Sequence, residues 1–356
     1  SKGDAKLMRL AVPTKGQSDP VYDTVDSMNN AIDGDHTSIA EVLGSAGYVS
    51  GRFGKWHLGK DLQGFTVSSA NGKPGLVGKK FYGNIDVAEK LTDAAVEFIE
   101  QNKEKPFFLY VAHWDVHGPI RARKDVVAKY KKKLETYTDD GAWQWNPIYA
   151  AMLDAVDTSV GRIRAKIKQA GLEDNTLIIF TSDTGGASVA TPHRPLRGAK
   201  GAFFEGGIRV HTCAAWPAVI KPGSRSDAAL TSVDFMPTFA ELAGATLPAN
   251  QPVDGRSFTK VLRGQAALQN RAIFWHYPLY LSGAGYNKVL PVYGTDKMNW
   301  RAVPSSVIRK GDYKLIYYYE YDDYKLFNLR DDLSEKNDLA QKMPQKAKQL
   351  HAELMA

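Results

Sequence analysis

The chain has 356 residues, 43% of them hydrophobic and 24% charged, which is ordinary for a globular protein of about two domains. Its single cysteine, Cys213, excludes an intrachain disulfide framework. The sequence contains no run of 18 apolar residues, so no transmembrane helix is predicted. The net charge of +7 comes from dispersed basic residues. This pattern argues against nucleic-acid binding and fits either a solvated basic surface or attraction to a polyanion.

Helices and strands alternate along the first two thirds of the sequence. Residues 1–34 lack a periodic apolar pattern and predict a surface segment. Ser38 and Glu41 form a predicted capping box for the first helix. Apolar residues three and four apart predict helices over 39–46, 86–101, 149–170 and 232–243. Apolar runs predict strands over 47–53, 107–111, 177–180 and 208–216. The alternation predicts an α/β fold whose buried parallel sheet is covered by helices on both faces.

The pattern changes after residues 248–255, the predicted domain boundary. Short strands joined by tight turns are predicted over 305–309, 313–319 and 324–328, which indicates an antiparallel sheet. The sequence therefore predicts a catalytic domain over 1–250 and a small α+β domain over 251–356.

Three predicted strands in the first domain end in loops with charged or imidazole side chains. Lys55 and His57 follow the first strand, His117 follows the second, and Asp183 follows the third. Ligands of open α/β sheets bind beyond the carboxyl ends of the strands. We therefore expect these residues to converge on one site for an anion and a hard cation.

The loops also carry a family resemblance. The stretch GYVSGRFGKWHLGK resembles the second signature of the type I sulfatases. The resemblance continues through FFLYVAHWDVHGP, YAAMLDAVDTSVGRI, DNTLIIFTSDTGG and PLRGAKGAFFEGGIR, and covers most of residues 35–240. It implies an alkaline-phosphatase-like α/β/α sandwich with a smaller C-terminal antiparallel-sheet domain. The implied activity is sulfuric ester hydrolysis on a sulfated carbohydrate, in the periplasm or outside a bacterial cell.

The resemblance assigns catalytic roles to four residues of this sequence. Lys55 would contact the sulfate and the nucleophile, and His57 would hydrogen-bond the formylglycine of the family. His117 would protonate the leaving alcohol, although Gly118 replaces the usual threonine. Lys200 would bind the sulfate and share the acid role. The structural alternatives are a solvated Lys55–His57 pair and a histidine that only stabilises its loop.

The family also implies Ca²⁺, a substrate pocket and structural arginines. Asp183 and Thr184 would be calcium ligands, with Thr184 at a position where the family usually has asparagine. Residues considered for sugar contacts, any of which can instead be packing residues, are Trp114, His193, Arg194, Tyr277, Trp300 and Arg301. Arg197 and Arg209 can equally be members of structural ion pairs.

Two family elements do not occur before residue 47. These are a strand ending in paired aspartates and a Cys/Ser-x-Pro-Ser-Arg motif that supplies the formylglycine. Cys213 lies in an apolar strand without Pro-Ser-Arg after it and is expected to be buried. The chain is thus expected to be an incomplete form that binds calcium weakly and turns over no sulfate ester, whereas its full-length parent is expected to be an active sulfatase. A phosphate mono- or diester hydrolase and a non-catalytic glycan-binding remnant are the alternatives.

Overall fold

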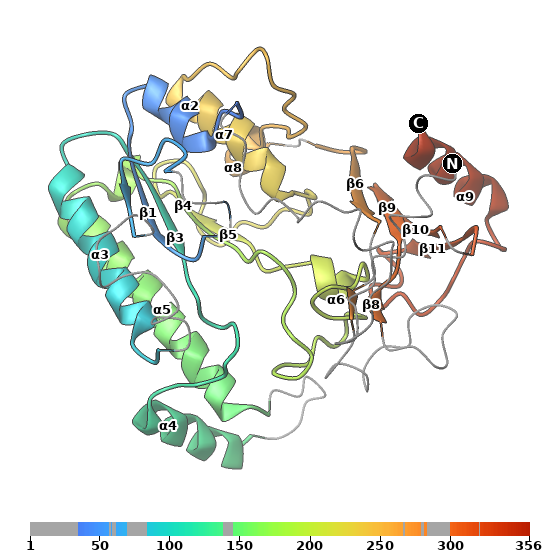
Figure 1. Cartoon of the computed structure of the whole chain (residues 1–356), viewed down its shortest axis with the longest axis horizontal. Coiled ribbons are helices and arrows are strands. Elements are labelled where there is room, and N and C mark those ends of the chain that lie inside the picture. The colour runs from blue at the N-terminus through green and yellow to red at the C-terminus, as the bar shows by residue number, and fades with distance from the viewer. Residues whose placement is uncertain are drawn as a thin grey trace, which may run out of the picture.

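The computed structural model describes residues 35–56, 58, 62–69, 84–137, 145–265, 268–278, 281–282, 300–319 and 321–356. Figure 1 shows a larger α/β part joined to a small sheet near the C-terminus. The helices are α2 Ile39–Ser45, α3 Val87–Asn102, α4 Lys124–Glu135, α5 Pro147–Gln169, α6 Glu205–Ile208, α7 Phe235–Ala243, α8 Thr259–Leu262 and α9 Pro344–Met355. The predicted helices 39–46, 86–101, 149–170 and 232–243 correspond to α2, α3, α5 and α7.

The strands of the larger part are β1 Val49–Gly54, β2 Val67–Ser68, β3 Phe107–Ala112, β4 Ile178–Phe180 and β5 Cys213–Ala215. Strands β2, β1 and β3 form a parallel sheet in that order, and β4 pairs antiparallel with β5. The predicted parallel sheet is confirmed for β1 and β3. Within the described residues, however, the strand at 177–180 pairs only with β5 and shares no ladder with β3.

Helices cover both faces of the parallel sheet (Figure 1). On one face, Phe53 of β1 packs with Leu91 and Phe98 of α3, and α5 lies against α3. On the other face, Phe108 of β3 contacts Phe239 of α7. The α/β/α sandwich expected from the sequence is therefore present, because alternate residues of β3 face opposite helical layers.

Two burial predictions for these strands are wrong. Strand β3 is only partly buried, and its Tyr110 is 44% exposed, although its apolar sequence predicts burial on both faces. Cys213 is exposed rather than buried. It begins the three-residue strand β5, whose described partner is β4 alone, so its apolar neighbours in the sequence do not enclose it.

The C-terminal sheet is antiparallel, as the sequence predicts. Its order is β11-β10-β9-β6, with bounds β6 Ala272–Tyr277, β9 Ser305–Lys310, β10 Tyr313–Tyr318 and β11 Asp323–Asn328. Strands β7 Leu281–Ser282 and β8 Trp300–Ala302 form a separate pair. Helix α9 packs on this sheet, where Leu350 is fully buried with Ile308 and Leu315. Strand β6 is an element that the sequence patterns did not predict.

Glycine at position 54 lets β1 end beside β3. Its φ is +112°, and a Cβ placed there would lie 1.9 Å from the carbonyl oxygen of Ala112. The Gly54 N–H also donates to Ser69 Oγ at 2.9 Å. A larger residue would clash with backbone and adopt a disfavoured dihedral, so this strand end requires glycine.

We predict that Gly54→Ala lowers the free energy of unfolding by about 2 kcal/mol or more, because backbone must move to relieve the contact. Urea denaturation measures the change. The matched control is Gly44→Ala in α2, where a Cβ would meet nothing within 4 Å. That control should leave stability equal or raise it by up to about 1 kcal/mol. Equal losses in both variants would contradict the proposed close approach.

Candidate functional site

The ends of β1 and β3 bring the first two predicted loops side by side. Gly54 pairs with Ala112 in the parallel ladder, and the Lys55 N–H donates to the Ala112 carbonyl at 2.8 Å. The Lys55 ammonium lies 6.0 Å from the centre of the Trp114 ring. Parallel register thus places Lys55 next to the loop that carries His117, as strand-end reasoning predicts.

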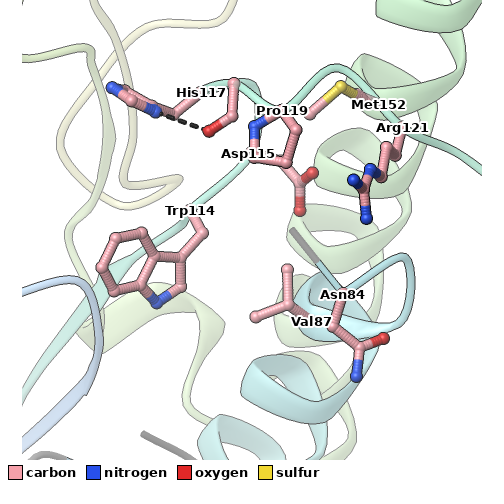
Figure 2. A pocket seen from close by; sticks show the side chains of 9 residues that line it. Asn84, Val87, Trp114, Asp115, His117, Pro119, Arg121 and Met152 are labelled. Carbon is pink, nitrogen blue, oxygen red and sulfur yellow. Dashed lines mark hydrogen bonds between the residues drawn. The ribbon is translucent and has the colours of Figure 1, made fainter. Parts of the chain in front are cut away.

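His117 is exposed in the loop after β3. Its backbone N–H donates to the Trp114 carbonyl at 2.9 Å, and its Nδ1 lies 2.8 Å from the Gly118 carbonyl oxygen (Figure 2). A carbonyl accepts hydrogen bonds, so in this contact Nδ1 carries a proton and donates it. Trp114 is half-buried against the apolar cluster of β1 and α3, which is a packing contact.

The two later loops are joined through their backbones. The Gly185 N–H donates to the Gly207 carbonyl at 2.9 Å, and the Lys200 N–H donates to the Gly186 carbonyl at 3.0 Å. A Cβ on Gly185 would lie 1.9 Å from the carbonyl oxygen of Gly206. The loop that carries Asp183 and the loop that carries Lys200 therefore form one backbone-linked unit.

Asp183 and Thr184 supply oxygen atoms at the surface of this unit. Asp183 is exposed, and the Thr184 hydroxyl donates to the Gly185 carbonyl at 3.1 Å. Among the described residues, no group of three histidine, cysteine or acidic side chains is arranged to hold a metal ion. Calcium needs six to eight oxygens, so these two residues do not make a calcium site by themselves.

Tyr110 of β3 interacts electrostatically with the carboxylate of Asp183. Partial burial raises the pKa of the Tyr110 phenol, and the negative charge of Asp183 raises this pKa further. The interaction requires the Asp183 loop to lie near β3. The loop after β4 therefore lies near β3, although β3 and β4 share no ladder among the described residues.

The residues considered for substrate contacts have different surroundings. The His193 ring lies against Gly186, since a Cβ on Gly186 would be 3.0 Å from His193 Cε1. Burial lowers the pKa of His193, and a hydrogen bond with the Gly186 backbone opposes this shift. Arg194 is exposed. His57 lies outside the described residues, and of Arg301 only the backbone, in β8, is described.

Asp115 is a site residue that the sequence patterns did not single out. Burial raises its pKa to about 6. In Figure 2 its carboxylate lies on the side of the loop toward Arg121 and Asn84, whereas the rings of Trp114 and His117 lie on the other side. A small pocket of the described residues is lined by these side chains together with Val87 and Met152. The only sequence signal was a carboxylate between two predicted site residues.

Arg52 was also missed. Its side chain is 1% exposed, its guanidinium lies 3.5 Å from the centre of the Trp56 ring, and its Nε and Nη2 donate to Ser68 Oγ. Burial lowers its pKa to about 10. Arg52 therefore supports the residue between Lys55 and His57 from inside the sheet.

Known proteins share both parts of this architecture. A family profile described as Sulfatase matches residues 15–245, which include the loops with Lys55, His117, Asp183 and Lys200. The chain belongs to the sulfatase family. A second profile, described as N-sulphoglucosamine sulphohydrolase, C-terminal, matches residues 199–356. The overlap contains the Lys200 loop, so this loop is common to the two profiles.

Individual relatives agree with the family assignment. A sulfatase of Formosa agariphila is 36% identical over 278 residues, which are 72% of this chain and 46% of that protein. Human steryl-sulfatase is 31% identical over 201 residues, which are 54% of this chain and 32% of that enzyme. The chain thus spans less than half the length of these two relatives.

Solved structures with the same fold include two with bound saccharides. The complex of Ps i-CgsB with k-i-k-neocarrahexaose has a TM-score of 0.72 at 25% identity and covers 92% of this chain and 75% of that one. The complex of BT4656 with its substrate D-glucosamine-2-N,6-O-disulfate has a TM-score of 0.63 at 21% identity and covers 92% and 82%. The second likeness shows the fold alone.

The loop after β3 contains a buried titratable group with a testable effect. Burial lowers the pKa of His113 to about 4, and its Nε2 lies 3.2 Å from Ser159 Oγ of α5. The folded state therefore keeps His113 neutral at pH 7. Because protonation favours the unfolded chain, the stability due to this depressed pKa is complete above pH 6.5 and is lost as pH falls toward 4.

We predict that His113→Gln removes this pH dependence. The difference in unfolding free energy between wild type and variant should shrink by up to about 3 kcal/mol between pH 7 and pH 4. Urea denaturation at several pH values measures it. Asp115 titrates in the same range but is present in both proteins, so its contribution cancels. A difference that stays constant with pH would show that His113 is not held neutral.

Proposed function

We propose that this protein hydrolyses sulfate esters of a carbohydrate. The observation that carries the proposal is the backbone-linked pair of loops with Asp183 and Lys200, found in a sulfatase-family chain together with adjacent Lys55 and His117 loops. Two cationic side chains and one imidazole are the groups that bind a sulfate ester and protonate its leaving oxygen.

In this proposal Lys55 and Lys200 balance the charge of the bound sulfate. His117 gives a proton from Nε2 to the leaving sugar oxygen, because its Nδ1 is engaged with the Gly118 carbonyl. His57 would hydrogen-bond the nucleophile, as the family resemblance implies. No step is assigned to Cys213, which is exposed in β5 and is not followed by Pro-Ser-Arg.

A sulfated carbohydrate is the proposed substrate class. It is supported by the net charge of +7 and by the saccharides bound in two proteins of the same fold. Trp114, His193, Arg194 and Arg301 are the proposed sugar contacts. A glycan of this kind agrees with the proposed periplasmic or extracellular location. No helix of the described residues has the length and apolarity needed to cross a membrane.

Calcium is the proposed metal, with Asp183 and Thr184 among its ligands. The described residues do not provide a full set of oxygens, so further ligands have to come from elsewhere in the protein. When bound, the ion would balance negative charge on the sulfate.

We predict that the chain binds a sulfated monosaccharide and not its desulfated form. Lys200→Ala should weaken this binding by about tenfold, because one charge-assisted contact with the sulfate is lost. Isothermal titration calorimetry at low ionic strength measures both affinities. The matched control is Lys260→Ala, an exposed lysine of α8, which removes the same charge away from the site. Equal effects of the two substitutions, or equal binding of both sugars, would disprove the proposed sulfate site.

We predict that the chain of 356 residues binds Ca²⁺ weakly, because Asp183 is the single carboxylate assigned to the ion. Calorimetric titration with calcium chloride should show no binding at micromolar concentration. Micromolar affinity that disappears in Asp183→Ala would show that the protein supplies additional ligands near this loop.

A further inference from the structure

Three ionisable side chains are buried together between α6 and the C-terminal sheet (Figure 1 shows α6 beside this sheet). Lys314 of β10, Glu205 of α6 and Glu335 of the loop before α9 are each 1% exposed or less. Lys314 Nζ lies 2.9 Å from Glu205 Oε1 and 2.5 Å from Glu335 Oε1. It also donates to the Phe203 carbonyl at 2.9 Å. The cluster thus joins the C-terminal sheet to the segment that follows Lys200.

Glu335 fixes this segment, residues 197–209, at two points. Its Oε2 accepts a hydrogen bond from the Glu205 N–H at 2.6 Å, and its backbone carbonyl accepts one from Arg197 Nη1 at 2.9 Å. Within the segment, Arg209 Nε donates to Glu205 Oε2 at 2.6 Å. Glu335 therefore contacts the segment directly at Arg197 and Glu205, and Arg209 joins the same cluster through Glu205.

The cluster is costly to bury and specific in its geometry. Burial raises the pKa of Glu335. Burial alone would also raise the pKa of Glu205, but the positive charges of Lys314 and Arg209 outweigh it and lower this pKa. Buried ion pairs add little net stability compared with apolar packing, and their best-attested use is to select one arrangement. Apolar contacts such as that of Phe204 with Phe327 stabilise the same interface, but they are not directional and do not fix the backbone conformation.

The segment held in this way carries Lys200. The Lys200 N–H donates to the Gly186 carbonyl in the Asp183 loop, while Glu335 and Lys314 contact residues 197, 203 and 205 of the same segment. We propose that Lys314 and Glu335 are positioning residues that keep Lys200 directed at the sulfate. The C-terminal sheet would then contribute to sulfate binding by orienting this lysine. This inference rests on the proposed role of Lys200 in sulfate binding.

The test is Glu335→Asp, which keeps every charge and withdraws the carboxylate by one methylene. Glu335 has a φ of +53°, a conformation that aspartate tolerates better than glutamate, so the backbone is not impaired. The affinity for inorganic sulfate should fall by about tenfold. Amide hydrogen exchange in residues 198–207 should rise, while exchange in the C-terminal strands stays the same.

The matched control is Glu353→Asp. Glu353 of α9 pairs with Lys310 of β9 at 2.7 Å, in the same C-terminal part but without contact to the Lys200 segment. This substitution should change neither sulfate affinity nor exchange in residues 198–207. An equal loss of affinity in both variants, or unchanged affinity in Glu335→Asp, would overturn the proposal.

Two further outcomes separate positioning from other roles. If Glu335→Asp unfolds or raises exchange evenly along the chain, the cluster has a stability role alone and the proposal is wrong. If wild-type protein binds no sulfate, or Lys200→Ala leaves binding unchanged, the proposed function fails instead. Exchange in residues 198–207 then still decides whether Glu335 orders the segment.

Discussion

Close approach of backbone to backbone is the constraint on which the candidate site depends. Gly54 lets β1 end against the Ala112 carbonyl, and Gly185 lets the Asp183 loop meet the carbonyl of Gly206. In both places a single methyl group would lie 1.9 Å from an oxygen. The resulting hydrogen bonds fix where Lys55 and Lys200 leave the backbone, before any side-chain contact acts on them.

Buried charge has a second role in the same region. Arg52 lies beneath Trp56, and Lys314 with its two glutamates lies beneath the segment that carries Lys200. In each case an ionised group away from the solvent supports a neighbour of a proposed sulfate-binding lysine. Because such groups tolerate few geometries, they specify the loop conformation more than they stabilise the fold. The buried charges of Arg52 and Lys314 thus support the loops, whereas different charges, on Lys55 and Lys200, would contact the substrate.

Membership of the sulfatase family suggests a function for these loops. The Sulfatase profile covers the sheet and its loops, and the second profile begins at residue 199 and continues to residue 356. The Lys200 segment lies in both. The domain boundary predicted at residues 248–255 stays a prediction, and the buried ion cluster crosses it. If Lys200 binds sulfate as proposed, this cluster would couple sulfate binding to the packing of the C-terminal sheet.

The sequence by itself determined the local features of this protein. Ser38 and Glu41 form the predicted capping box, the helices lie where apolar residues repeat, and Lys55 and His117 follow parallel strands. These features depend on neighbours within a few residues or on the shared direction of parallel strands. The five ordered family segments also predicted the α/β/α sandwich and the sulfatase membership.

Only the tertiary structure decided the long-range contacts. Lys314 and Glu205 are 109 residues apart, and no local pattern indicates that a lysine in an apolar strand will be buried with two glutamates. Cys213 and Tyr110 lie in apolar runs, yet both are exposed, because the exposure of a strand side chain depends on what packs against its face of the sheet. Pairing between distant segments depends on the packing of the whole chain, and that packing leaves no periodic signal in the sequence.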